Sequence, residues 1–232
     1  MKVAVSKCKS KFDKYLNWLE HFGVKYEVLN YEEDNKKGME MLTECSALIL
    51  TGGTDIYPEI YCDWDTTKTK GTYEPERDGF ELNLLGEAIK LGMPVLAICR
   101  GSQLVNVYFR GSLIFDIEEI RGISYRKIPE GKEHNEIEIN IYNDTLLHRI
   151  LGSDTAKVVV SNNQAVERVG EGLMINSRSK EGIAEGIEYS DKEGKNFLLG
   201  IQWHPERYSD YDTPVSVKLI NTLIEESKKF IS

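Results

Sequence analysis

The chain has 232 residues, of which 41% are hydrophobic and 29% are charged, a composition typical of a globular protein with a sizeable core. The formal net charge of −9 argues against nucleic acid and anionic membranes as partners, because no basic tract offsets it. No run of 18 or more apolar residues occurs, so a membrane-spanning helix is not expected.

The cysteines give no sign of a disulfide framework or a zinc cluster. They are far apart in the chain and include no Cys-x-x-Cys pair. The first residues, MKVAVSKCKSKFDK, lack the long apolar core of a signal peptide. We therefore expect a cytoplasmic protein without a metal ion. The four cysteines are Cys8, Cys45, Cys62 and Cys99.

The first part of the chain alternates short apolar runs with amphipathic stretches. Strands are predicted at 2–6 (KVAVS), 24–30 (VKYEVLN) and 47–53 (ALILTGG), with a helix over about 11–22 between the first two. Strands that alternate with helices in this way indicate a parallel sheet covered on both faces.

A second helix and a sharp corner follow. Apolar residues recur at helical spacing over about 76–91, and Gly92 is a suitable residue to end that helix. The apolar run VLAI at 95–98 predicts a strand that stops at Cys99. A further helix is predicted to start directly after Cys99 and to run to about residue 109.

After residue 130 the pattern changes to strand-like segments separated by turn residues, which indicates hairpins. A last helix is predicted over about 215–230, with Thr213 as its N-cap and Pro214 at its first position. We expect one α/β domain over residues 1–232, with a mainly parallel sheet and a hairpin-rich C-terminal part. The strand-like segments are 135–142, 156–161, 173–178, 182–189 and 197–203.

Three polar clusters follow predicted strands, namely TGGTD at 51–55, CRGSQ at 99–103 and HPE at 204–206. Ligands bind beyond the carboxyl ends of the strands in an open parallel sheet. If all three strands run parallel, the three clusters meet at one edge of the sheet. The sequence therefore predicts a site at that edge.

The residues in these clusters suit acyl transfer by a cysteine. A thiol at a strand-to-helix corner is lifted clear of the sheet, and the positive end of the helix dipole favours the thiolate. His204 can take the proton of Cys99, and Glu206 can orient the imidazole. The backbone N–H groups of Gly53 and Arg100 are candidates for an oxyanion hole. The remaining histidines, His21, His134 and His148, are interpreted as surface residues.

Taken together, these motifs resemble the class I glutamine amidotransferase superfamily, which has a flavodoxin-like fold. Within it the chain looks most like the γ-glutamyl amide hydrolase branch, typified by gamma-glutamyl-gamma-aminobutyrate hydrolase. The matching blocks span most of residues 46–206 in the family's order. They are TGGTDIYPEIY (51–61), ERDGFELNLL (76–85), PVLAICRGSQLVNVYFRGSLIFD (94–116), NQAVERVGEGL (163–173) and LGIQWHPE (199–206).

The resemblance implies a catalytic triad of Cys99, His204 and Glu206 and an oxyanion hole from Gly53 and Arg100. It implies hydrolysis of a small γ-glutamyl amide through a cysteine thioester, with no metal or organic cofactor. The substrate-binding residues that it implies are Asp55, Gln103, Asn162, Asn163 and Gln164.

Two positions depart from the family's pattern. Ala97 stands where the family usually has glycine, which a backbone with negative φ tolerates. Asn162 and Asn163 stand where the family commonly has two histidines, and we expect this segment, with the loop after TGGTD, to shape the amine side of the pocket.

Two other functions stay open at this point. The chain could be a glutaminase subunit that passes ammonia to a synthase partner, or a catalytically silent binding domain on the same fold. The intact cysteine, histidine and glutamate argue against the silent domain. A homodimer and a peptide-like γ-glutamyl substrate also stay open.

Overall fold

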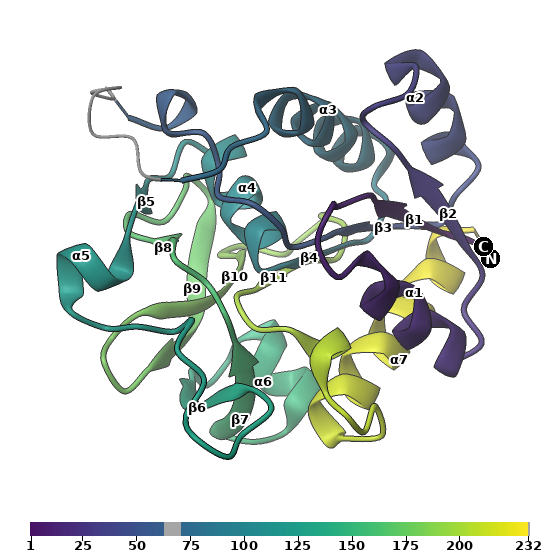
Figure 1. The fold of residues 1–232 in the computed structure, drawn as a ribbon. Coiled ribbons are helices and arrows are strands. Elements are labelled where there is room, and N and C mark those ends of the chain that lie inside the picture. The colour runs from purple at the N-terminus through teal and green to yellow at the C-terminus, as the bar shows by residue number, and fades with distance from the viewer. Residues whose placement is uncertain (63–70, 232) are drawn as a thin grey trace.

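The fold is built on one nine-stranded sheet, seen in Figure 1 in a computed structural model that describes residues 1–62 and 71–231. The order of its strands is β2-β1-β3-β4-β11-β10-β9-β6-β7. The first five strands in this order pair in parallel, and the remaining pairings are antiparallel. This division confirms the prediction of a mainly parallel sheet followed by hairpins.

The parallel half holds the buried strands of the predicted βαβ units. Every residue of β1, β3, β4 and β11 is buried, as is typical of strands that helices cover on both faces. The order 2-1-3-4 followed by a last parallel strand is the flavodoxin-like order. The strands are β1 (Val3–Ser6), β2 (Tyr26–Leu29), β3 (Ala47–Leu50), β4 (Val95–Ile98) and β11 (Leu198–Ile201).

The antiparallel half extends the sheet beyond β11. It begins with β10, which pairs with both β11 and β9. Two short strands, β5 and β8, form a separate antiparallel pair. These strands are β5 (Leu113–Ile114), β6 (Asn135–Ile141), β7 (Thr155–Val160), β8 (Ala165–Val166), β9 (Leu173–Ser179) and β10 (Ala184–Tyr189).

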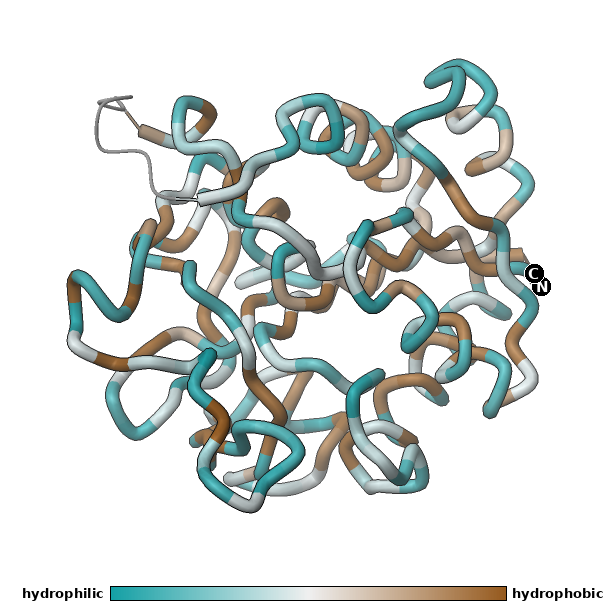
Figure 2. Tube along the Cα trace, in the orientation of Figure 1, coloured by the Kyte–Doolittle hydropathy of each residue, from teal (hydrophilic) through white to brown (hydrophobic). Residues whose placement is uncertain are grey.

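Helices cover both faces of the sheet (Figure 1). One hydrophobic core lies between the sheet and α1, α6 and α7, and the other lies between the sheet and α2, α3 and α4. In Figure 2 the hydrophobic segments lie mostly inside the molecule, along the strands and the inner sides of the helices. The helices are α1 (Phe12–His21), α2 (Asn35–Thr43), α3 (Pro75–Leu91), α4 (Arg100–Tyr108), α5 (Ile117–Arg121), α6 (Leu146–Leu151) and α7 (Pro214–Phe230), with 3₁₀ turns η1 (Pro58–Ile60) and η3 (Pro205–Arg207).

The structure confirms the predicted helices α1, α3, α4 and α7. Gly92 ends α3 in the left-handed conformation at φ 72°, and the Thr213 hydroxyl accepts from the backbone N–H of Ser216 at the start of α7. Helices α2, α5 and α6 were not predicted. Within residues 1–62 and 71–231, no helix is long and apolar enough to cross a membrane.

Candidate active site

Cys99 lies at the predicted corner between β4 and α4. Its backbone angles of φ 53° and ψ −107° are rare for a residue with a side chain, and such strain persists where the surrounding structure enforces it. The Cys99 N–H donates to the Ile201 carbonyl at 2.7 Å, which fixes the corner to β11. Gly101 then lets α4 pack on β3, because a Cβ atom there would lie 2.4 Å from the Leu50 oxygen. Ala97 is fully buried and its φ is not positive, so its methyl group is accommodated in β4.

His204 and Glu206 follow β11 and are both buried. His204 has an extended backbone, and η3 begins at Pro205 and brings Glu206 back toward the imidazole. The Nδ1 atom of His204 lies 2.7 Å from Oε1 of Glu206. This contact assigns the Nδ1 proton and leaves Nε2, which has no hydrogen-bond partner among the described residues, for another group.

His204 and Glu206 shift each other's pKa. Burial alone lowers the pKa of His204. The Glu206 carboxylate and, next in size, Cys99 raise the pKa by more than burial lowers it, so the pKa lies above its ordinary value. Burial raises the pKa of Glu206, but His204 outweighs that effect and holds the pKa below its ordinary value. The pair therefore favours an imidazolium beside a carboxylate.

Gly52 connects this pair to Cys99. A Cβ atom at Gly52 would lie 3.1 Å from Cε1 of His204 and 3.4 Å from Cβ of Cys99, so the backbone of this glycine lies close to both residues. The Gly52 N–H donates to the Tyr15 hydroxyl at 2.9 Å. The structure therefore brings the three predicted clusters together at one edge of the sheet.

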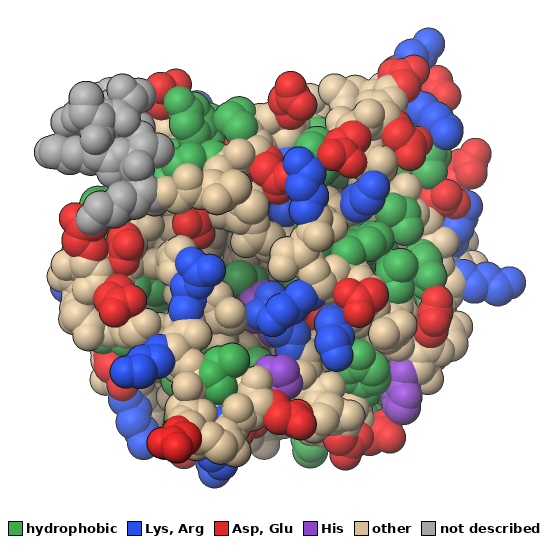
Figure 3. Space-filling model, in the orientation of Figure 1, with side chains coloured by type: hydrophobic (Ala, Val, Ile, Leu, Met, Phe, Trp, Pro, Cys, Tyr) green, Lys and Arg blue, Asp and Glu red, His purple; other side chains and the backbone are tan. Residues whose placement is uncertain are grey.

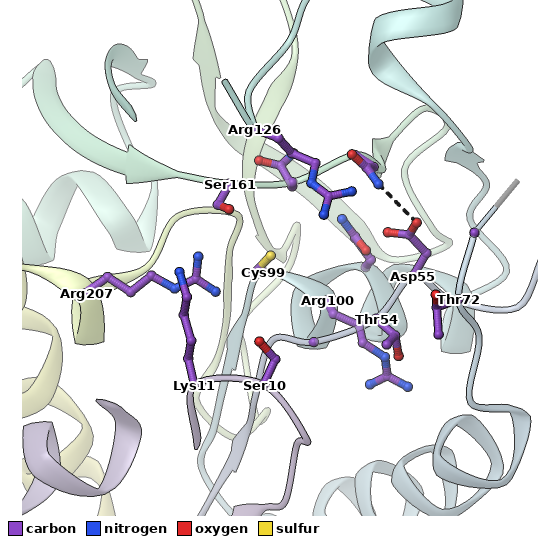
Figure 4. Close-up of a pocket in the computed structure, with 15 residues that line it drawn as sticks. Ser10, Lys11, Thr54, Asp55, Thr72, Cys99, Arg100, Arg126, Ser161 and Arg207 are labelled. Carbon is purple, nitrogen blue, oxygen red and sulfur yellow. Dashed lines mark hydrogen bonds between the residues drawn. The ribbon is translucent and has the colours of Figure 1, made fainter. Parts of the chain in front are cut away.

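Cys99 opens onto a cavity of about 390 Å³, shown in Figure 4. Seven of the predicted site residues line it, whereas His204 and Glu206 lie behind the lining. In Figure 3, which shows one face of the molecule, Lys and Arg side chains flank a hollow near the middle of that face. The seven residues are Gly53, Asp55, Cys99, Arg100, Gln103, Asn162 and Asn163.

The side chain of Gln164 lies outside the cavity, so it does not have the position expected of a substrate-binding group. Its Oε1 accepts from the Ile56 N–H at 2.8 Å, and its Nε2 donates to the Ile56 carbonyl at 3.2 Å and to the Tyr61 hydroxyl at 3.1 Å. All of these contacts are to the segment after β3. Gln164 therefore supports that segment.

The hydrogen bonds of Gln103, Asn162 and Asn163 decide which of their polar atoms are free to bind a substrate. The Nε2 of Gln103 is occupied, because it donates to the Gln164 carbonyl at 2.7 Å and to Gln202 at 3.1 Å. Asn163 donates to the Asp55 carboxylate at 3.3 Å, as Figure 4 shows. The Oδ1 of Asn162 is buried and has no partner in the described part of the chain.

Sequence reasoning missed four residues at this site. Gln202 donates to the Cys99 sulfur at 3.5 Å, and it stands in the motif LGIQWHPE two positions before His204. The other three are cations that line the cavity: Lys11 and Arg126 stand in segments without a motif, whereas Arg207 directly follows the predicted HPE cluster.

The cations divide into two groups about Cys99. In Figure 4, Lys11 and Arg207 lie to one side of the sulfur, and Arg126 and Asp55 lie to the other. The charge of Arg207 is the main cause that lowers the pKa of Lys11, so the two cations face each other closely enough to repel. Lys11 also has a left-handed backbone, with φ 55°.

Comparisons with known proteins agree with this geometry. The chain is 36% identical over 173 residues to Protein NtpR of Enterococcus hirae, which covers 74% of this chain and 71% of NtpR. It is 27% identical over 202 residues to the gamma-glutamyl-gamma-aminobutyrate hydrolase of Escherichia coli O157:H7, which covers 84% of this chain and 77% of that protein.

A solved structure and a protein family also match this chain. A glutamine amidotransferase of Thermotoga maritima has the same fold, with a TM-score of 0.59 at 18% identity over 99% of this chain and 84% of that one. The family Peptidase C26 matches residues 3–206, which include all three polar clusters. The chain belongs to the Peptidase C26 family, whose fold is that of the class I glutamine amidotransferases.

Proposed function

We propose that the protein is a cysteine-dependent hydrolase that cleaves γ-glutamyl amides to glutamate and an amine. One observation carries the proposal: the strained Cys99 lies on a cavity next to a buried His204, whose Nδ1 is bonded to Glu206. The family membership supports hydrolysis, and the 27% identity to gamma-glutamyl-gamma-aminobutyrate hydrolase supports a γ-glutamyl substrate.

The reaction begins with attack of the Cys99 thiolate on the γ-carbonyl carbon. The backbone N–H groups of Gly53 and Arg100 stabilise the negative oxygen of the tetrahedral intermediate. His204 then gives its Nε2 proton to the leaving nitrogen as the C–N bond breaks and the glutamyl thioester remains. The imidazole, now neutral, takes a proton from water, whose oxygen attacks the thioester carbon. The C–S bond then breaks, which releases glutamate and restores the Cys99 thiolate beside the imidazolium.

The glutamyl head group is assigned to the side of the cavity that holds Asp55 and Arg126. A free α-amino group needs an anion or a neutral acceptor, which Asp55 and the unpartnered Oδ1 of Asn162 can provide. The α-carboxylate needs a cation, and Arg126 stands near enough to Asp55 to lower its pKa against the larger effect of burial. Asn163 orients the Asp55 carboxylate.

The amine leaves on the opposite side, because His204 must reach the leaving nitrogen. Arg207 lies on that side, since its Nε is 3.3 Å from the carboxylate that holds His204. Lys11 and Arg207 repel each other, and an anion between them relieves the repulsion. We assign the amine side to these cations in place of Asn162 and Asn163, and we propose that the amine part carries an acidic group.

A panel of γ-glutamyl amides tests the function. The panel contains glutamine, neutral alkylamides and amides of amino acids, and glutamate release by the isolated protein is measured. The proposed hydrolase cleaves members of the panel without a partner. Activity with glutamine alone, and only when a synthase subunit is added, would instead identify a glutaminase subunit.

A further inference from the structure

Four charged side chains form a buried group at the wall of the cavity, which one of them, Arg100, lines. Three of them come from the first two turns of α3 and one from the first residue of α4, on neighbouring helices (Figure 1). None is more than 1% exposed. A buried charge costs free energy unless it is paired, so we asked which groups these four side chains bind. The four residues are Arg77, Asp78, Glu81 and Arg100.

Arg77 binds the loop that carries a proposed oxyanion donor. Its Nη2 donates to the Gly52 carbonyl at 2.8 Å and to the Thr51 hydroxyl at 3.0 Å. Its Nε donates to Oε1 of Glu81 at 3.0 Å. The guanidinium thus clamps the backbone of the Gly52–Gly53 segment from the side away from the cavity, because Arg77 is not among the residues that line it.

This clamp sets the direction of the Gly53 N–H. The Gly52 carbonyl and the Gly53 N–H belong to one trans peptide, in which the two groups point in opposite directions. Because Arg77 holds the carbonyl on the far side, the N–H points to the side of the cavity that Gly53 lines with Cys99. The Tyr15 hydroxyl fixes the preceding N–H, of Gly52.

A peptide between two glycines needs such a clamp. Glycine reaches most backbone conformations at little cost, so an unheld Gly–Gly peptide can rotate. Rotation would turn the Gly52 carbonyl toward the cavity and would remove a donor from the site of the developing negative charge. Gly53 itself has φ 148°, and a Cβ atom there would lie 2.1 Å from Nη1 of Arg77, so the loop and the guanidinium are fitted to each other.

The same network reaches the second oxyanion donor. The Arg100 guanidinium donates to Oε2 of Glu81 and to Oδ1 of Asp78. Glu81 therefore binds Arg77 through one oxygen and Arg100 through the other. Burial raises the pKa of Glu81, but Arg100 and Arg77 together hold the pKa below its ordinary value. One ionised carboxylate therefore links Arg77, which holds the Gly52–Gly53 peptide, to Arg100, whose backbone N–H is the second donor.

We propose that Arg77 is a positioning residue that, through Glu81 and Arg100, holds the oxyanion hole in its active arrangement. This inference rests on the proposed function for its kinetic consequences, but the direction of the Gly53 N–H can be tested without a substrate.

The test compares Arg77→Met with the wild-type protein in three measurements. Because one oxyanion donor is misdirected, kcat for a γ-glutamyl amide is expected to fall about 10²–10³-fold while KM changes less than about threefold. The rate of Cys99 alkylation by iodoacetamide is expected to stay within about twofold, since that reaction forms no oxyanion. A crystal structure of the variant is expected to show the Gly52 carbonyl turned toward the cavity.

Two further variants keep the test decisive. Arg178→Met removes an arginine that also donates to a backbone carbonyl, that of Gly182, but away from the cavity, and it is expected to change none of the three readouts. If Arg77→Met does not fold, Arg77→Lys keeps the positive charge beside Glu81 but loses the forked donor, and it takes its place. The proposal is overturned if kcat is unchanged, if alkylation of Cys99 slows in parallel with kcat, or if the Gly52–Gly53 peptide has not rotated. A wild-type protein that cleaves no γ-glutamyl amide overturns the proposed function alone.

Discussion

The Nδ1 atom of His204 lies 2.7 Å from Oε1 of Glu206, and both side chains are fully buried. The sequence separation is only two residues, so the contact depends on Pro205, which starts η3 and turns the chain back. Because Glu206 accepts a hydrogen bond from Nδ1–H, the other ring nitrogen is available to a further group, and the backbone of Gly52 lies close to both the imidazole and Cys99. In our proposal, the base that serves the thiol is oriented by this carboxylate.

Glu206→Gln is expected to lower kcat/KM by about 10²-fold or more. A glutamine keeps the shape but removes the negative charge that stabilises the imidazolium and favours the required tautomer. Steady-state kinetics on a γ-glutamyl amide measures the loss. Glu193→Gln, on an exposed turn, serves as the control and should leave the kinetics unchanged. Equal activity of the two variants would remove Glu206 from the proposed triad.

The same pair predicts how stability depends on pH. The raised pKa of His204 adds stability that is complete below its ordinary value of about 6.5 and is lost as the pH rises through the raised value. The lowered pKa of Glu206 adds stability that is complete above about 4.5 and is lost as the pH falls through the lowered value. The pair is therefore expected to stabilise most between about pH 4.5 and 6.5.

Urea unfolding of the wild-type protein and of Glu206→Gln, measured across this range, checks the prediction. The difference in free energy of unfolding between the two proteins should be largest between about pH 4.5 and 6.5 and should shrink on both sides. A difference that stays constant with pH would show that the two groups do not interact as ions.

Lys11→Ala is expected to raise KM about two- to fivefold for γ-glutamyl amides whose amine part is acidic, and to leave neutral amides unchanged. The modest size follows from the exposure of Lys11, because exposed ion pairs are weak. Lys14→Ala is the matched control, since Lys14 is exposed on the same helix but does not line the cavity. An equal change in KM for acidic and neutral amides would contradict the assignment of the amine side.

Gly101→Ala and Gly79→Ala are expected to have opposite effects on stability. A Cβ atom at Gly101 would lie 2.4 Å from the Leu50 carbonyl oxygen, so the substitution should cost about 2–3 kcal/mol. At Gly79, in the exposed part of α3, a Cβ atom would meet no atom within 4 Å, so alanine should stabilise by about 0.5–1 kcal/mol. Thermal and urea unfolding of both variants measure the two changes. A stable Gly101→Ala protein would mean that α4 can move away from β3.

The parallel half of the sheet could be predicted from the sequence because its strands are short apolar runs that alternate with amphipathic helices. The corner at Cys99 was predictable for the same reason, since β4 ends abruptly at a polar segment. Helix α2 was missed because only Gly38 and Leu42 of its nine residues are buried, which leaves little periodic signal. Gly38 is needed there for close packing against Phe80.

The charged parts of the site could not be predicted, because their roles depend on contacts between distant segments. Arg77, Asp78 and Glu81 stand on a helix where charged residues would ordinarily face solvent, and only the fold turns them inward against Arg100. Lys11 lies at a helix N-cap with no polar pattern around it that indicates a cavity.

Glutamate release from a panel of γ-glutamyl amides, by the wild-type protein and by Cys99→Ala, tests the proposed function most directly. Cys45→Ala is the control, because burial raises the pKa of that thiol to about 11 and it lies outside the cavity. We predict that the wild-type protein and Cys45→Ala release glutamate at the same rate, with acidic amides preferred, and that Cys99→Ala releases none. Substantial glutamate release by Cys99→Ala, or none by the wild-type protein from any amide in the panel, would contradict a cysteine-dependent γ-glutamyl hydrolase.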